Sequence, residues 1–315
     1  MDLTIRKLKV FVTIAQMGSF TDAAKLFHLT SPALSLMVKG LEEEIGFKVF
    51  DRTTRSVRLT PAGTSLMPYA QQMLSEHRNL TQAMHAIGQK NAGMVRVAST
   101  QALSCTVVPP LNSRFQENWP SIQVVPVDAL AHRVHELLLR GEADIGIAPE
   151  RACEGDIISR ELFEVQLHVA CSIRHRFAQQ SSVRWADLRD EHLFVVDRNT
   201  VPMMARDSGY QVMLNKHTEV GHFSTALALA NEDAGVVVCA NYVRKLIRPY
   251  DLVFLPLVDP VAVRKVMLFH NRRFTMSPAA ERYADHLAST SPQLECAYTR
   301  SRPLAARPRE IARAV

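Results

Sequence analysis

Residues 18–63 read GSFTDAAKLFHLTSPALSLMVKGLEEEIGFKVFDRTTRSVRLTPAG, and this stretch decides how the N-terminal part of the chain folds. Ser19 and Thr30 each stand where a helix N-cap is expected, because each precedes a run with helical spacing of apolar residues. Pro32 falls in the first turn of the second run, where its missing N–H costs nothing. The spacing predicts a helix over 31–45 that follows a shorter one after a tight turn. Such a pair is typical of a helix-turn-helix.

The next segment, residues 47–59, is expected to form a two-stranded wing with arginines around its turn. Arginines there would meet phosphates or a minor groove beside the helix over 31–45, which is expected to read the bases and is called the reading helix below. The alternative is a plain three-helix bundle in which Ser31 and Ser35 are merely solvated, and the wing argues against it. The head therefore predicts contacts with double-stranded DNA from the following residues: Thr30, Ser31, Pro32, Ser35, Leu36, Lys39, Arg52 and Arg55.

The charge distribution supports a polyanion-binding head. The formal net charge is +6; residues 1–65 hold 9 Lys and Arg against 6 Asp and Glu, and residues 291–315 hold 5 against 2. The segment between them is neutral. A basic head on a neutral body fits a nucleic-acid-binding module joined to a part that does not bind polyanions. The basic segment 291–315 is expected to be a mobile tail.

Hydropathy and cysteine usage exclude several classes. No apolar run approaches the roughly 18 residues that a membrane span needs, and the N-terminus lacks the apolar core of a signal peptide. We therefore expect a cytoplasmic protein without a membrane partner. Five scattered cysteines without a C-x-x-C pair argue against a disulfide framework and a zinc site. No metal and no cofactor are expected.

A long helix is predicted from Pro61 to about residue 89. Its apolar residues recur at alternating spacings of four and three, which is typical of a coiled-coil seam, and polar residues between them keep the stripe narrow. A helix lying on its own domain is the alternative, but a narrow stripe favours a partner helix. The residues expected to form a dimer contact are Leu66, Met73, Leu80, Met84 and Ile87.

Beyond residue 93, strand-like and helical runs alternate, and the strands are nearly continuous apolar runs such as 143–148 and 236–240. This pattern predicts an α/β body with a parallel sheet covered on both faces. The length of about 200 residues suits two α/β subdomains with a cleft between them. Ligands of such sheets bind at the carboxyl ends of strands, where helix N-termini favour an anion. The candidate effector contacts are Ser99, Thr100, Gln101, Asp128, Thr200, Pro202 and His222.

The head carries a family resemblance. It is similar to the signature of LysR-type transcription regulators at Gly18-Ser19-Phe20, Ala23-Ala24, Pro32-Ala33-Leu34-Ser35, Leu41-Glu42, Ile45-Gly46, Val49-Phe50, Leu59-Thr60 and Ala62-Gly63. The resemblance implies a winged helix-turn-helix over 1–60, a dimerising linker helix over 61–90 and a two-subdomain effector domain over 91–290. That domain resembles periplasmic solute-binding proteins.

The resemblance also implies a function. A regulator of this kind binds promoter DNA as a dimer or tetramer, responds to a small-molecule effector, for which an organic anion is one candidate here, and contacts RNA polymerase if it is an activator. Two departures affect base reading: the family commonly has Gln before the proline, and Arg or another polar residue followed by Gln after the second serine, where this chain has Ser31, Leu36 and Met37. An apolar pair cannot donate to guanine, although Leu36 can touch a thymine methyl.

Two other functions are alternatives. An enzyme is not expected, because the sequence contains no nucleophile elbow, phosphate-binding loop, H-E-x-x-H or dinucleotide fingerprint. A cytosolic solute-binding protein without regulatory DNA binding would suit the body alone. It would leave the basic head and the heptad helix without a purpose.

Overall fold

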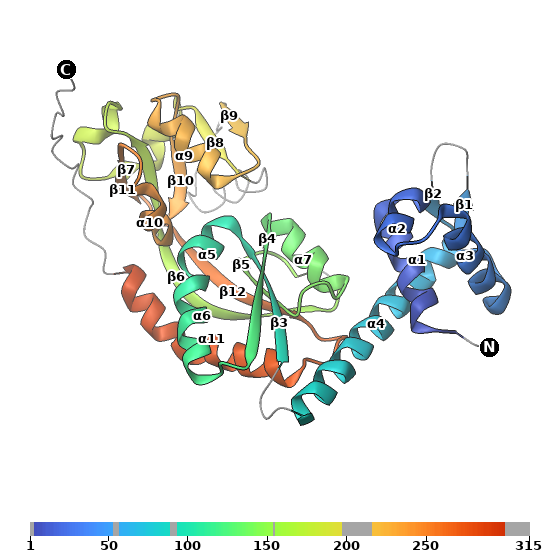
Figure 1. The fold of residues 1–315 in the computed structure, drawn as a ribbon. Helices are drawn as coiled ribbons and strands as arrows, with labels where there is room; N and C mark the ends of the chain where they lie inside the picture. The colour runs from blue at the N-terminus through green and yellow to red at the C-terminus, as the bar shows by residue number, and fades with distance from the viewer. Residues whose placement is uncertain (1–2, 53–56, 89–92, 154, 197–215, 300–315) are drawn as a thin grey trace, which may run out of the picture.

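The computed structural model describes residues 3–52, 57–88, 93–153, 155–196 and 216–299, except for the side chains of residues 52, 82–83, 85–88 and 295–299. A small helical head, one long helix and a larger α/β body follow one another along the chain (Figure 1). None of the described helices combines the length and apolar character that a bilayer crossing requires.

Three helices and a two-stranded wing make up the head: α1 (Ile5–Met17), α2 (Phe20–Leu26), α3 (Ser31–Ile45), β1 (Phe50–Arg52) and β2 (Val57–Leu59). The Ser19 hydroxyl accepts a hydrogen bond from the Asp22 N–H at 3.2 Å, and the Thr30 hydroxyl accepts one from the Ala33 N–H at 3.3 Å. Both expected N-caps are therefore confirmed. Gly46, with φ of 80°, ends α3 in the left-handed region that favours glycine.

The wing is an antiparallel pair in which Phe50 lies opposite Leu59 and Arg52 lies opposite Val57. A carboxylate on α3 anchors it: Glu42 Oε1 accepts hydrogen bonds from the backbone N–H of Val49 at 2.9 Å and of Phe50 at 3.3 Å. The angle of the wing to α3 is therefore fixed by a side chain of α3 itself.

The linker helix α4 (Pro61–Gly88) contacts both the head and the body. Ala70 is buried in the core of the head, and Leu66 and Leu74 pack against that core. Polar side chains on the next turns contact the body, as described below. The helix thus connects the two units physically and does not merely space them apart.

The strands of the body are β3 (Gly93–Thr100), β4 (Ile122–Ala129), β5 (Ile145–Pro149), β6 (Ile157–Ser172), β7 (Val183–Arg184), β8 (Leu193–Val195), β9 (His217–Glu219), β10 (Val237–Ala240), β11 (Leu252–Val258) and β12 (Val263–Asn271). Its α-helices are α5 (Gln101–Thr106), α6 (Val108–Asn118), α7 (Ala131–Leu139), α9 (Phe223–Asn231), α10 (Arg244–Ile247) and α11 (Pro278–Thr299). Short 3-10 helices are η1 (Arg176–Gln179), η2 (Trp185–Leu188) and η3 (Asn241–Val243).

The main sheet is mixed, whereas the sequence pattern predicts a parallel sheet. Its order is β4-β3-β5-β12-β6-β11-β7, with β10 also paired to β6. Only β3 with β4 and β5, and β11 with β7, are parallel pairs in this sheet, among the residues described; β12, β10 and β11 run antiparallel to β6. A continuous apolar run reports that both faces of a strand are covered, and it carries no information on direction.

One strand, β6, belongs to both subdomains, of which the first contains β3, β4, β5 and β12 and the second contains β7 to β11. Residues 157–166 of β6 pair with β12, whereas residues 167–172 pair with β10 and β11. The first subdomain is covered by α7 on one face and by α6 and α11 on the other (Figure 1). Consecutive residues of β3 divide between these faces, since Val97 belongs to the core beneath α6 and Ala98 to the core beneath α7.

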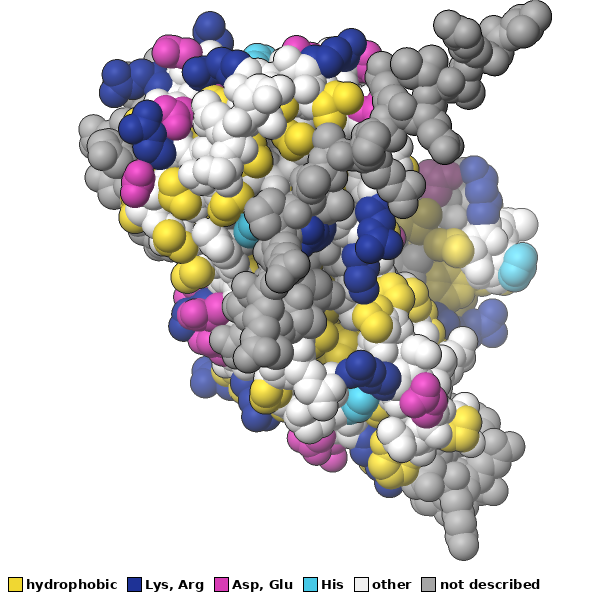
Figure 2. Space-filling model, turned by 90° about the vertical axis from the view of Figure 1, so that its left-hand side faces the viewer, with side chains coloured by type: hydrophobic (Ala, Val, Ile, Leu, Met, Phe, Trp, Pro, Cys, Tyr) yellow, Lys and Arg dark blue, Asp and Glu magenta, His cyan; other side chains and the backbone are white. Residues whose placement is uncertain are grey.

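The expected tail needs a correction at its start. Helix α11 continues to Thr299, so residues 291–299, which the sequence pattern places in a mobile tail, are helical. Leu294 is buried in the main core, which explains why the helix persists. Residues 300–315 lie outside the described residues. On the face of the molecule drawn in Figure 2, basic and acidic side chains are interspersed, in line with the neutral charge of the body.

Candidate DNA interface and effector cavity

Helix α3 buries one stripe of side chains and exposes the opposite one. The buried stripe consists of Leu34, Val38 and Leu41. The exposed stripe consists of Pro32, Leu36, Lys39 and Glu43. Leu36 is 68% exposed. Since a recognition helix contacts base edges mainly with its N-terminal residues, the exposed part of α3 that is available for this contact begins with apolar side chains.

The other expected DNA contacts lie around this stripe or outside the described residues. Thr30 is exposed, with its hydroxyl engaged as the cap of α3, and Ser31 and Ser35 are half-buried beside the stripe. Lys39 is exposed and forms a loose ion pair with Glu43 at 3.6 Å. Arg55 and the side chain of Arg52 fall outside the described residues. For these residues, contact with DNA stays a prediction.

A hollow of about 650 Å³ lies between α3 and the first strand of the wing. Leu36 and Lys39 line it from the helix, and Lys48 and Asp51 line it from the wing side. Lys48 is not among the residues that the sequence predicts to contact DNA. In the sequence, the feature that could have indicated a DNA contact for Lys48 is its position just before the first wing strand.

The linker helix exposes large apolar residues along one line. Tyr69, Met73, Leu80 and Met84 are exposed at spacings of four, seven and four residues. Leu66, expected in the dimer seam, instead packs against the head core, because the first turns of α4 lie on the head. The side chain of Ile87 lies outside the described residues. The open part of the seam therefore begins near Met73.

The polar face of the linker helix is bound to the body. Asn79 Nδ2 donates to the Thr275 carbonyl at 2.6 Å, and the Thr275 N–H donates to Glu76 Oε1 at 3.1 Å. Arg78 donates to the Gly141 carbonyl. The head also touches the body directly, where Gln16 Nε2 donates to Glu142 Oε1 at 2.6 Å. These polar residues, which in the sequence only delimit the apolar stripe, form the joint between linker and body.

A cavity of about 670 Å³ lies between the two subdomains. Four of the expected effector contacts lie in its wall: Thr100, Gln101, Asp128 and His222. Thr100 makes no capping hydrogen bond with α5, so its hydroxyl is not used by the helix it precedes. Thr200 and Pro202 lie outside the described residues.

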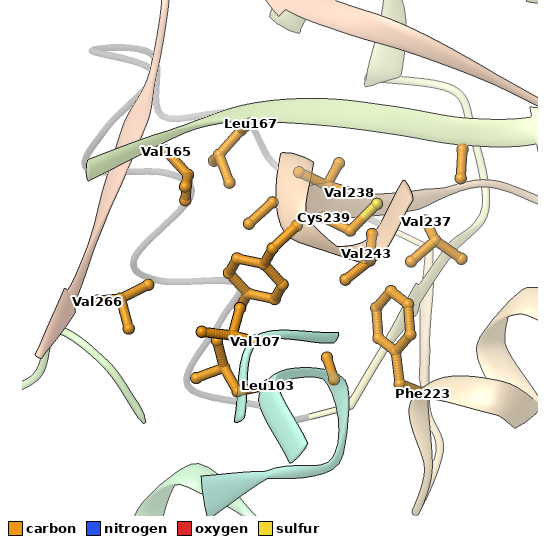
Figure 3. Close-up of a cluster of buried hydrophobic side chains, with 14 of the residues drawn as sticks. Leu103, Val107, Val165, Leu167, Phe223, Val237, Val238, Cys239, Val243 and Val266 are labelled. Atoms are coloured by element: carbon orange, nitrogen blue, oxygen red, sulfur yellow. The ribbon is translucent and has the colours of Figure 1, made fainter. Parts of the chain in front are cut away.

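The cavity is largely apolar, with charged groups in the wall toward the first subdomain. Its apolar wall includes Leu167, Phe194, Phe223, Val237, Val238 and Val243. Figure 3 draws part of the buried apolar core beside the cavity, in which Leu103 and Val107 belong to the same cluster as Phe223 and the β10 residues Val237, Val238 and Cys239. Arg133, Arg151 and Arg264 also line the cavity, together with Asp128 and Glu150. The wall therefore carries more basic than acidic side chains.

The arginines of the cavity wall differ in their hydrogen-bond partners. Arg133 pairs with Glu136 at 2.8 Å. The Nε of Arg151 is buried and has no hydrogen-bond acceptor among the described residues. A buried donor without an acceptor costs free energy, and a bound anion would satisfy it.

The placement of Ser99 corrects one expectation. Ser99 is fully buried, its hydroxyl lies 2.6 Å from that of Ser104, and it is not part of the cavity wall. Successive strand residues point to opposite faces, so Ser99 and Thr100 cannot both face the cleft.

Gln101 has a role that sequence reasoning missed. Its Oε1 accepts a hydrogen bond at 2.8 Å from the backbone N–H of Phe223, at the start of α9. His222, the N-cap residue of α9, makes no side-chain capping bond. An amide from the first subdomain therefore caps a helix of the second subdomain across the cleft.

The thiols and phenol near the cavity are held in their protonated forms. Burial raises the pKa of the Cys239 thiol and of the Tyr242 hydroxyl. Burial, and next the nearby Asp128 carboxylate, raise the pKa of Cys105. A raised thiol pKa leaves little thiolate at neutral pH, so these cysteines lack the feature that makes a thiol reactive. Within the described part of the chain, no three His, Cys, Asp or Glu residues gather as metal ligands would.

A winged helix-turn-helix, a linker helix and a two-subdomain body around a cavity define a DNA-binding transcription regulator with a sensing domain. Known family models agree with this class both for the head and for the body. The model of the bacterial regulatory helix-turn-helix proteins of the lysR family matches residues 5–64, and the model of the LysR substrate binding domain matches residues 88–292. The chain belongs to the LysR family of transcriptional regulators.

Relatives and solved structures extend over nearly the whole chain. An uncharacterized HTH-type transcriptional regulator of Escherichia coli, YbhD, is 28% identical over 284 residues, covering 89% of each chain. A full-length OxyR variant from Pseudomonas aeruginosa has a TM-score of 0.69 at 24% identity, covering 91% of this chain and 95% of that one. CbnR complexed with its target DNA has a TM-score of 0.66 at 20% identity, covering 91% and 100%. At these identities the two structures support the fold.

Proposed function

We propose that this LysR-family regulator binds promoter DNA as a dimer or tetramer and that a small organic anion in the cavity changes that binding. The observation that carries the proposal is the cavity of about 670 Å³ between the subdomains, with the unpaired Nε of Arg151 in its neighbourhood. A solute-binding protein without DNA binding is not favoured, because the head belongs to a DNA-binding family.

The ligand class follows from the cavity wall. An apolar surface that includes Leu167, Phe223 and Val238 favours burial of a hydrocarbon group, at about 25 cal/mol per Å² of apolar area. The excess of arginine favours a carboxylate or another anion at the charged side. A carboxylic acid with an apolar body fits both features, and Asp128 provides an acceptor for a hydroxyl or amine on it.

We infer the remaining parts of the function from the architecture together with the family. Two heads joined through α4 would read two half-sites of an operator, and pairing of bodies would give the tetramer. We expect action in the cytoplasm, where promoter DNA lies, contact with RNA polymerase if the protein is an activator, and no catalytic turnover. DNA contact is assigned to the exposed stripe of α3 and to the wing, including Arg52 and Arg55.

A thermal-shift screen of the full chain tests the ligand class. The probes are aliphatic and aromatic carboxylates, each paired with its neutral amide. A carboxylate that binds should raise the melting temperature by mass action, whereas its amide should not. Arg151→Gln should reduce the shift, and Arg160→Gln, an exposed arginine on β6 outside the cavity wall, should keep it. Equal shifts with acid and amide, or a full shift in Arg151→Gln, would overturn the assignment.

A further inference from the structure

The exposed position of Leu36 on the reading helix points to a specific kind of base reading. Leu36 is 68% exposed on α3, between Pro32 and Lys39 in the outward stripe. The neighbouring Met37 is only partly exposed and packs against the head core. Of the apolar pair at positions 36 and 37, one side chain therefore supports the fold, and the other faces the side where DNA is expected.

The chemistry of the major groove limits what Leu36 can recognise. A leucine side chain neither donates nor accepts a hydrogen bond, so it cannot read guanine, adenine or the amino group of cytosine directly. The apolar feature that the groove presents is the C5-methyl group of a pyrimidine. Lys39, one turn further along the same stripe, pairs loosely with Glu43 and carries a positive charge that suits a phosphate. Leu36 lies nearer the N-terminal end of α3, which is the part of a reading helix that contacts base edges.

We propose that Leu36 is a specificity-determining residue that reads a pyrimidine C5-methyl group in the operator. This inference rests on the assignment of α3 as the DNA-reading helix. Two sources supply the same methyl group, thymine and 5-methylcytosine. Contact with thymine makes Leu36 a reader of sequence, and contact with 5-methylcytosine makes operator binding depend on DNA methylation.

The first measurement establishes an operator for the full chain by selection from random duplexes. Each thymine in it is then replaced in turn by deoxyuridine, which lacks only the methyl group, and each cytosine is replaced by 5-methylcytosine. Removing the methyl group that Leu36 contacts should weaken binding by about fourfold, the factor that corresponds to about 0.8 kcal/mol for one buried methyl group. An effect confined to thymine positions identifies thymine as the source, and a gain at a methylated cytosine identifies 5-methylcytosine.

Leu36→Ala provides the second half of a double-substitution cycle. The variant should bind the unmodified operator more weakly and should bind methylated and unmethylated bases equally well at the sensitive position. Leu26→Ala is the matched control, because Leu26 is 63% exposed on α2, outside the reading helix. It should keep the full methyl dependence.

Two results separate the possible failures. Specific binding of the wild-type chain without methyl dependence at any position, or methyl dependence that persists in Leu36→Ala, overturns the role of Leu36 alone. Failure to select any specific duplex overturns both this role and the DNA-reading assignment of α3.

Discussion

Single residues show where the sequence pattern is informative and where it is not. The caps Ser19 and Thr30 could be predicted because a cap is a local arrangement, made within a few residues of the chain. Ser99 could not be placed, because the side of a strand that faces a cleft depends on distant segments. Gln101 was expected to meet the effector and is engaged by Phe223 of the other subdomain.

The hydroxyl of Thr100 gives the residue-scale prediction. Thr100→Val removes a hydroxyl from the cavity wall at little change in volume, so it should weaken the effector response several-fold and leave the melting temperature and basal operator binding unchanged. Titration of operator binding with effector measures this. Thr225→Val, at an exposed position of α9 outside the wall, is the control. An unchanged midpoint in Thr100→Val would remove Thr100 from the ligand contact.

At the scale of elements, periodicity predicts that a helix is amphipathic but does not predict its partner. The alternating spacing along α4 predicts one continuous seam. In the structure, the first turns face the head and only the later turns remain open. The direction of the strands could not be predicted for a similar reason. The apolar composition of a strand reflects its burial, whereas its direction depends on the connections between strands.

The open part of the α4 seam gives the element-scale prediction. Leu80 is 60% exposed, and Leu80→Asp would place a charge in an apolar contact between two helices. The dimer should dissociate, and specific operator binding should fall by more than about tenfold, because one half-site offers too few contacts. Light scattering and gel shift measure the two effects. Thr81→Asp, an exposed neighbour outside the seam, should leave the dimer intact. An intact dimer in Leu80→Asp would exclude this seam.

At the scale of the whole molecule, the joint between α4 and the body determines how a change at the cavity can reach DNA. Glu76 and Asn79 hold the backbone of Thr275, close after the end of β12, and β12 carries Arg264 of the cavity wall. A movement of the body therefore displaces the linker helix. Sequence reasoning could not find this joint, because its partners lie far apart along the chain.

Removing the side chains that form this joint gives the prediction at the scale of the whole molecule. The double variant Glu76→Ala with Asn79→Ala should bind effector and operator with affinities close to those of the wild type. The change in operator affinity on adding effector should shrink, because coupling free energies of about 1–3 kcal/mol need a physical connection. Operator titrations with and without effector measure the coupling. The control is Glu117→Ala with Asn118→Ala, at exposed positions of α6. Full coupling in the first double variant would place the connection elsewhere.

The shared strand β6 determines the mechanics of the body. Its 16 residues are hydrogen-bonded to the first subdomain at one end and to the second at the other. The backbone of β6 is thus held by neighbouring strands on both sides of the crossing, which disfavours a free hinge at this strand. A change in their relative angle has to be taken up as twist along β6. We therefore expect an occupant of the cavity to change the relative angle of the two subdomains by changing the twist of β6.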